Sequence, residues 1–122
     1  MPLHRLLGGA WRGEIPAYAS LFRYGHPDRV AERTRHALQA GFGQIKLHEV
    51  TVDVVAAARE AAGEDVPPML DTNCPWTPAP AQNMIEQPWD YRLHWLEEPI
   101  PPRGLCQSWQ AAIGHRHVTG CR

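Results

Sequence analysis

The chain has 122 residues, of which 12 are basic and 13 acidic, and 43% of them are hydrophobic. This length describes one soluble domain at most, and the balanced charge favours neither a nucleic-acid nor a membrane partner. The first residues lack the apolar core of a signal peptide, and no run approaches the roughly 20 residues of a membrane span. We therefore expect a cytoplasmic protein. Its cysteines, Cys74, Cys106 and Cys121, are odd in number and unevenly spaced, which predicts free thiols.

The first half of the chain predicts strands that alternate with helices. Residues 15–22 alternate apolar and small side chains, which is typical of a strand. Pro27 then opens a helix with apolar positions at helical spacing, and Gly41 is placed to stop it. Residues 42–48 form the second predicted strand.

The same alternation continues to the end of the chain. Thr51 is expected to cap a second helix, which stops at Gly63. The remaining predicted elements are strands at 67–70, 93–96 and 117–119 and helices at 79–87 and 105–113. Four strand and helix units followed by a fifth strand predict a parallel sheet with helical crossovers.

A half-barrel is the fold class that this order predicts, with four to five parallel strands and helices on the outer face. Eight strand and helix units of a complete (β/α)8 barrel need about 250 residues, roughly twice this length. A half-barrel leaves strand edges unpaired, which favours pairing with another chain or aggregation.

Lys46, Asp71 and Glu97 each end or nearly end an apolar run. Their spacing, 25 and 26 residues, corresponds to about one strand, one helix and two short loops. If the runs are parallel strands, the three side chains project at the carboxyl edge, where α/β folds place their chemistry. Taken alone, Lys46 could be a solvated lysine at a strand end and Asp71 a helix cap. Glu97 is more specific, because a second acid and a proline follow it.

These residues resemble the mandelate racemase and muconate lactonizing enzyme branch of the enolase superfamily. In that family a lysine motif on the second barrel strand supplies a base, and carboxylates ending the third, fourth and fifth strands hold a magnesium ion. The resemblance implies that Lys46 is the base and that Asp71 and Glu97 are metal ligands. His48 is the candidate for a second base, although many members have a lysine there and a surface imidazole is the alternative.

Two further residues follow from the resemblance. Asn73 is expected to lie next to the ion or the substrate without being one of the direct metal ligands. Its alternative role is to cap the next helix. Glu98 is assigned in the same way to the surroundings of the metal or the substrate. No organic cofactor is implied.

The resemblance also predicts two parts of the chain. Residues 1–14 resemble the link that leads from the family's amino-terminal capping domain into the barrel, and residues 15–122 then form the first half of the barrel. Because well over a hundred residues precede this point in the family, Met1 is expected to be a start inside an ancestral gene. A flexible leader with a glycine turn is the alternative for residues 1–14.

The implied reaction removes a proton from the carbon next to a carboxylate of a small hydroxy acid or sugar acid, as a dehydratase or a racemase does. Magnesium stabilises the anionic intermediate as a Lewis acid. The family's third metal ligand is a glutamate after a threonine-glycine pair, whereas Thr119-Gly120 is followed here by Cys121, a soft ligand. We therefore expect weak or absent Mg²⁺ binding and an inactive isolated chain. The alternative is a split enzyme, completed by self-association or by a second chain that supplies the remaining strands and the cap.

Overall fold

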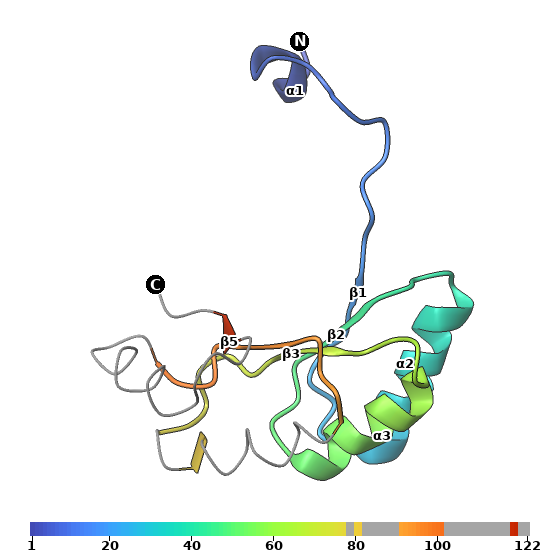
Figure 1. The fold of residues 1–122 in the computed structure, drawn as a ribbon, viewed down its shortest axis with the longest axis vertical. Helices are drawn as coiled ribbons and strands as arrows, with labels where there is room; N and C mark the ends of the chain where they lie inside the picture. The colour runs from blue at the N-terminus through green and yellow to red at the C-terminus, as the bar shows by residue number, and fades with distance from the viewer. Residues whose placement is uncertain (78–79, 82–90, 102–117, 120–122) are drawn as a thin grey trace.

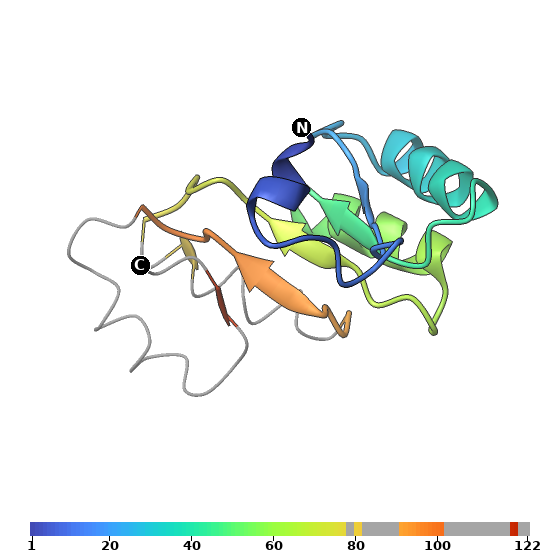
Figure 2. The same ribbon diagram turned by 90° about the horizontal axis from the view of Figure 1, so that it is seen from above.

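Five parallel strands form a single sheet in the computed structural model, which describes residues 1–77, 80–81, 91–101 and 118–119. The strands lie side by side in chain order (Figures 1 and 2). Their bounds are β1 Ala19–Ser20, β2 Ile45–Leu47, β3 Met69–Asp71, β4 Trp95–Glu97 and β5 Val118–Thr119. This all-parallel order confirms the predicted fold class, a partial (β/α) barrel.

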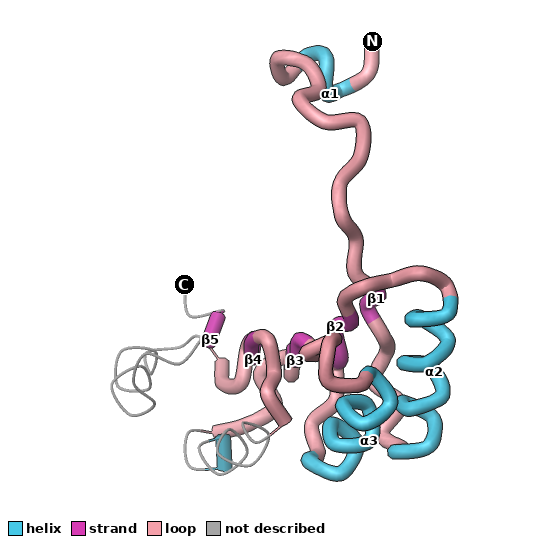
Figure 3. Tube along the Cα trace, turned by 45° about the vertical axis from the view of Figure 1, so that its right-hand side comes forward, coloured by secondary structure: helices cyan, strands magenta, loops and turns pink. Residues whose placement is uncertain are grey.

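Two helices, α2 (Pro27–Gln39) and α3 (Val52–Ala62), cover one side of the sheet (Figure 3). Proline lies in the first turn of α2, and Gly41 follows its end with a φ of +94°, a left-handed conformation that glycine adopts readily. Both predicted helix ends are therefore confirmed.

Thr51 occupies the N-cap position of α3, but its side chain does not make the expected capping hydrogen bond. Instead, hydrogen bonds from the Thr51 side chain and the Val54 amide lower the pKa of the exposed Asp53 carboxyl. The prediction that Thr51 caps the helix was therefore right about position and wrong about the group that accepts the bond. Asp53 supplies the acceptor in the first turn, where negative charge also suits the helix dipole.

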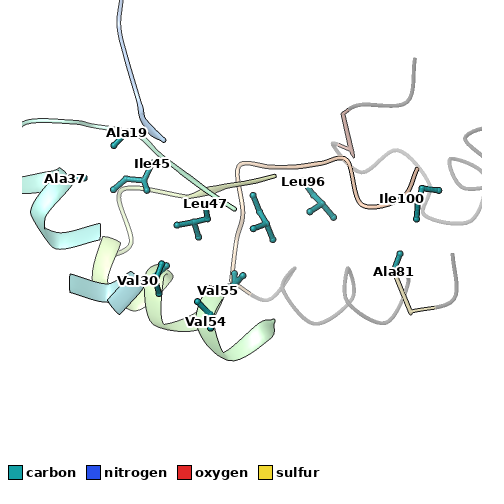
Figure 4. Close-up of a cluster of buried hydrophobic side chains, with 12 residues drawn as sticks. Ala19, Val30, Ala37, Ile45, Leu47, Val54, Val55, Ala81, Leu96 and Ile100 are labelled. Atoms are coloured by element: carbon teal, nitrogen blue, oxygen red, sulfur yellow. The ribbon is translucent and has the colours of Figure 1, made fainter. Parts of the chain in front are cut away.

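The hydrophobic core lies between the sheet and these helices (Figure 4). Ile45 and Leu47 of β2 are fully buried against Val30, Val54 and Val55. Each such side chain contributes about 1.5–3 kcal/mol by leaving water. Because side chains alternate along a strand, the residue between Ile45 and Leu47 is directed to the opposite side of the sheet.

The amino-terminal segment projects from the sheet on the side away from α2 and α3 (Figures 1 and 3). It contains the short helix α1 (Leu3–Leu6), which buries no residue. Its apolar side chains are exposed, with Trp11 at 98% and Ile15 at 80% of their maximum. The division into a link at 1–14 and a barrel segment at 15–122 stays a prediction.

The strands are shorter in the structure than the sequence predicts, and this is the largest difference between the two. The predicted strand at 15–22 shortens to β1, because β2 is its single pairing neighbour among the described residues and is in register with it only at Ala19 and Ser20. Of the predicted helix at 79–87, the described residues Pro80 and Ala81 are helical. The predicted helix at 105–113 lies outside the described residues. Within the described part of the chain, no helix is long and apolar enough to cross a membrane.

Candidate active site

Lys46, Asp71 and Glu97 meet on the side of the sheet opposite the helices, as their spacing predicts. Lys46 Nζ lies 2.8 Å from Asp71 Oδ2 and 3.0 Å from Glu97 Oε2. Asp71 and Glu97 are the last residues of β3 and β4 and lie directly opposite each other in register. The side chains of Lys46 and Asp71 are only 13% and 8% exposed, whereas Glu97 is 30% exposed. Two carboxylates therefore converge on one cationic group at the carboxyl ends of the strands.

The local sequence explains why these polar groups share one side. Leu47, Leu70 and Leu96 are buried in the core beneath the sheet. Their neighbours along the strands must then face the other way, because the side-chain period of a strand is two residues. The apolar pattern thus positions the lysine and the carboxylates as directly as it builds the core.

The electrostatics of Lys46 differ from what a base requires. Burial opposes its charge, but hydrogen bonds to Asp71 and Glu97, together with their negative charges, raise its pKa above the usual lysine value. In this arrangement the neighbours of Lys46 are anions, so its ammonium form is favoured, and its role as a base stays a prediction.

His48 lies beside the same carboxylate. Its Nε2 is 3.6 Å from Asp71 Oδ2, and its Nδ1 is 2.5 Å from the carbonyl oxygen of Leu21. Because a carbonyl only accepts hydrogen bonds, Nδ1 must carry the proton, which leaves the Nε2 of a neutral ring able to accept one. A cavity of about 330 Å³ opens next to the ring and is lined by Ser20, Leu21, Phe22, Arg23, His48 and Asn73.

Asn73 holds the carboxylate of Asp71 rather than capping a described helix. Its side-chain amide and its backbone N–H donate to Asp71 Oδ1 at 3.0 and 3.1 Å. This leaves Oδ2 to face Lys46. Asn73 adopts a φ of +57°, a left-handed conformation that asparagine tolerates better than most residues.

Glu98 turns away from Lys46. One of its carboxylate oxygens lies 3.9 Å from Cys74 Sγ, and its carbonyl accepts hydrogen bonds from Thr72 Oγ1 and the Cys74 amide. Burial and the nearby carboxylates of Glu98 and Asp71 raise the pKa of the Cys74 thiol. Cys74 is a free thiol, as predicted, while Cys106 and Cys121 lie outside the described residues.

The local sequence pattern missed two residues at the edge of this site. Arg23 donates from Nε to the His48 carbonyl at 2.6 Å and from Nη2 to the Thr72 carbonyl at 2.8 Å. The buried carboxylate of Glu49 accepts hydrogen bonds from the backbone N–H groups of Tyr24 and Gly25. These contacts join segments 24 to 49 residues apart, so no local pattern reveals them. One further feature of the sequence draws attention to the predicted base, because Lys46 is the only lysine in the chain.

The donor atoms of the site suit a hard divalent cation. Asp71 Oδ2 and Glu97 Oε2 already converge on a positive charge, and Mg²⁺ is commonly held by one or two carboxylates with water completing its coordination. Among the described residues, no group of three or more His, Cys, Asp and Glu side chains is arranged to hold a metal. Cys121, which stands at the position of the predicted third ligand, lies outside these residues.

The fold and the site together define a class of protein. A parallel sheet that is covered by helices on one side and carries a lysine and two carboxylates at its carboxyl edge is typical of a (β/α)-barrel enzyme. The model of the Enolase C-terminal domain-like family matches residues 29–118. The chain therefore belongs to the mandelate racemase and muconate lactonizing enzyme family of the enolase superfamily.

Individual relatives agree with this family. The D-galactarolactone cycloisomerase of Agrobacterium fabrum is 33% identical over 109 residues, a match that covers 82% of this chain and 29% of that enzyme. The dipeptide epimerase of Enterococcus faecalis, solved with Mg and the dipeptide L-Leu-L-Tyr, is 27% identical with a TM-score of 0.80 and coverages of 96% and 34%. A family protein from Azoarcus sp. EbN1 is 30% identical with a TM-score of 0.82 and coverages of 98% and 32%. The chain thus spans about a third of the length of these relatives.

Proposed function

We propose that this segment supplies the base and two metal ligands of a site that removes the proton next to the carboxylate of a small hydroxy acid or sugar acid. The observation that carries the proposal is the contact of Lys46 with both Asp71 and Glu97 at adjacent strand ends. Relatives named as a D-galactarolactone cycloisomerase and an L-talarate/galactarate dehydratase support the substrate class.

Each residue has a role that follows from its position. Asp71 and Glu97 would hold Mg²⁺, which supplies positive charge to the developing anion of the substrate. Lys46 must lose a proton to solvent before it can accept one from the substrate, and its two ion pairs oppose that loss because they favour its ammonium form. Mg²⁺ held by Asp71 and Glu97 would occupy the oxygens that pair with Lys46 and so would weaken this preference.

His48 is proposed as the second proton-transfer group. With Nδ1 donating to the Leu21 carbonyl, Nε2 faces the site and can take up or return a proton. Asn73 fixes the orientation of Asp71 through Oδ1. The cavity beside His48 leaves room for part of a small acid.

We propose further that the 122 residues alone do not turn over substrate. Proton abstraction needs the base, the ion and the substrate held in a dry site, and a misplacement of about 1 Å can cost on the order of 100-fold in rate. A complete barrel has about 250 residues. This chain matches about a third of its relatives' length, so most of the wall around their sites has no counterpart in it.

An isotope-exchange assay tests whether the isolated chain is inactive. The chain is incubated with MgCl₂ and a panel of sugar acids in deuterated water, and label is sought at the carbon next to the carboxylate. We expect no exchange above the rate of the Lys46→Ala variant. Arg59→Ala, which removes a cation from the far end of α3, serves as the matched control. Exchange that persists in Arg59→Ala and vanishes in Lys46→Ala would show that the chain alone is active.

A second candidate is a split enzyme, in which another chain supplies the remaining strands and the cap. The exposure of Trp11 and Ile15 favours this alternative, since apolar side chains on a projecting segment are commonly covered by a partner. Mixing the chain with a separately produced second barrel half of a relative tests it. Exchange that appears only in the mixture, and that depends on Lys46, would support the split enzyme.

A further inference from the structure

The loop between β1 and α2 is held against the carboxyl ends of β2 and β3 by side-chain to backbone contacts. Arg23 reaches from this loop to two carbonyls, that of His48 after β2 and that of Thr72 after β3. In the opposite direction, Glu49 reaches from the segment after β2 to the amides of Tyr24 and Gly25. We call Arg23 and Glu49, with these backbone partners, the loop clasp.

The two charged side chains of the clasp, Arg23 and Glu49, form their hydrogen bonds with backbone groups. Glu49 is 1% exposed, and in the described part of the chain its carboxylate is stabilised by N–H donors at 2.7 and 3.1 Å rather than by a cationic side chain. Hydrogen bonds to a charged acceptor are stronger than those between neutral groups. The guanidinium of Arg23 similarly presents two donors in a fixed fork, so it sets the separation of the two carbonyls that it binds.

The clasp surrounds the imidazole of His48. The ring donates from Nδ1 to the carbonyl of Leu21, which precedes Arg23 by two residues on the same loop. Arg23 binds the backbone of His48 itself, and Glu49 is the next residue in the chain. The Leu21 amide donates to the Lys46 carbonyl at 2.8 Å, and Arg23 and Glu49 hold the residues that follow Leu21, so the Leu21 carbonyl is fixed relative to the ring from both sides.

We propose that Arg23 and Glu49 are positioning residues that hold the β1–α2 loop so that the Leu21 carbonyl keeps the proton of His48 on Nδ1. The Nε2 atom of the neutral ring is then left as an acceptor toward the site. This inference rests on the proposed proton-transfer role of His48. Among the described residues, neither Arg23 nor Glu49 forms a hydrogen bond or an ion pair with Lys46 or Asp71, so both act through the imidazole and its loop.

The tautomer of His48 can be measured without any turnover. Nitrogen-15-labelled histidine in the full chain gives two-bond N–H correlation patterns that distinguish the Nδ1–H from the Nε2–H form. The spectrum is recorded at about pH 8.5 and at about pH 9.5, and a pattern that is the same at both belongs to the neutral ring. The pattern of His48 is identified as the one that disappears in His48→Gln.

We expect the Nδ1–H pattern in the unmodified chain and a loss of that preference in Arg23→Ala and Glu49→Gln. Arg23→Lys should restore part of it, because an ammonium keeps the charge but lacks the fork that spans two carbonyls. Arg59→Lys is the matched control, since Arg59 also donates to backbone carbonyls, those of Gly63 and Glu64, far from His48. Amide exchange at Tyr24 and Gly25 should quicken about tenfold in Glu49→Gln, as expected for a weakened hydrogen bond to a charged acceptor.

Amide protection at Val30 and Val55 in the core reports whether each variant remains folded. An unchanged Nδ1–H pattern in folded Arg23→Ala and Glu49→Gln would overturn the proposal. So would an Nε2–H ring in the unmodified chain, or loss of core protection in both Arg23→Lys and Glu49→Gln, because the two residues would then hold the fold as a whole. The exchange assay on sugar acids can fail while the tautomer result stands, so the two failures are distinguishable.

Discussion

Replacement of Lys46 by methionine tests its role as the cation that neutralises Asp71 and Glu97. Lys46→Met keeps the length of the side chain but removes the ammonium between Asp71 and Glu97. Removing one partner of a buried ion pair typically costs about 3–5 kcal/mol, since a buried charge is left without compensation. Asp71 is nearly buried, but Glu97 is 30% exposed and is partly screened by water. We therefore expect a loss of about 2 kcal/mol in the free energy of unfolding, which is below the range for a fully buried pair.

Thermal unfolding followed by circular dichroism measures this loss. For a chain of this length, about 2 kcal/mol corresponds to a fall in Tm of roughly 6–10 °C. MgCl₂ should reverse part of the fall in Lys46→Met, because the two carboxylates then bind the ion without competition from the ammonium. At about ten times the Kd, a ligand that binds only the folded state adds roughly 1.4 kcal/mol.

Two controls separate this effect from general changes in charge. Arg59→Met removes a cation at the exposed end of α3 and should leave the response to MgCl₂ unchanged. Adding Asp71→Asn to Lys46→Met should abolish the gain from MgCl₂, because one of the two converging carboxylates is lost. If MgCl₂ stabilises the unmodified chain and Lys46→Met equally, the ion does not bind between Asp71 and Glu97 and the assignment of these ligands is wrong.

Three further predictions concern the core, the loop and the metal site. Leu47→Ala should lower the free energy of unfolding by about 2–5 kcal/mol in chemical denaturation, because Leu47 is fully buried; a loss below about 1 kcal/mol would contradict the described core. Gly25→Ala should cost about 1 kcal/mol from its φ of +65° alone, since a Cβ at this site meets open space; an unchanged denaturation midpoint would show that the turn is relaxed. Cys121→Glu should strengthen Mg²⁺ binding in calorimetric titration if the chain after β5 continues in register with Glu97, and unaltered binding would argue against a third ligand at that position.

Much of the fold could be predicted from local sequence. Pro27 and Gly41 mark the limits of α2, and Gly63 follows the end of α3, because proline and glycine restrict or free the backbone at single positions. The spacing of Lys46, Asp71 and Glu97 predicted that they would meet, since parallel strands of a repeated unit place equivalent residues at one edge. These features depend on neighbours in the chain or on a regular repeat.

Other features were decided only by tertiary structure. The extent of β1 depends on which residues β2 can pair with, so an apolar pattern at 15–22 overestimates it. The pKa of Lys46 is raised because carboxylates 25 and 51 positions away surround its ammonium, which reverses the shift that a base needs. The contacts of Arg23 and Glu49 join loops that follow different strands. Charge and hydrogen bonding act through space, so a sequence names the groups that take part, while the folded chain decides which of them are neighbours.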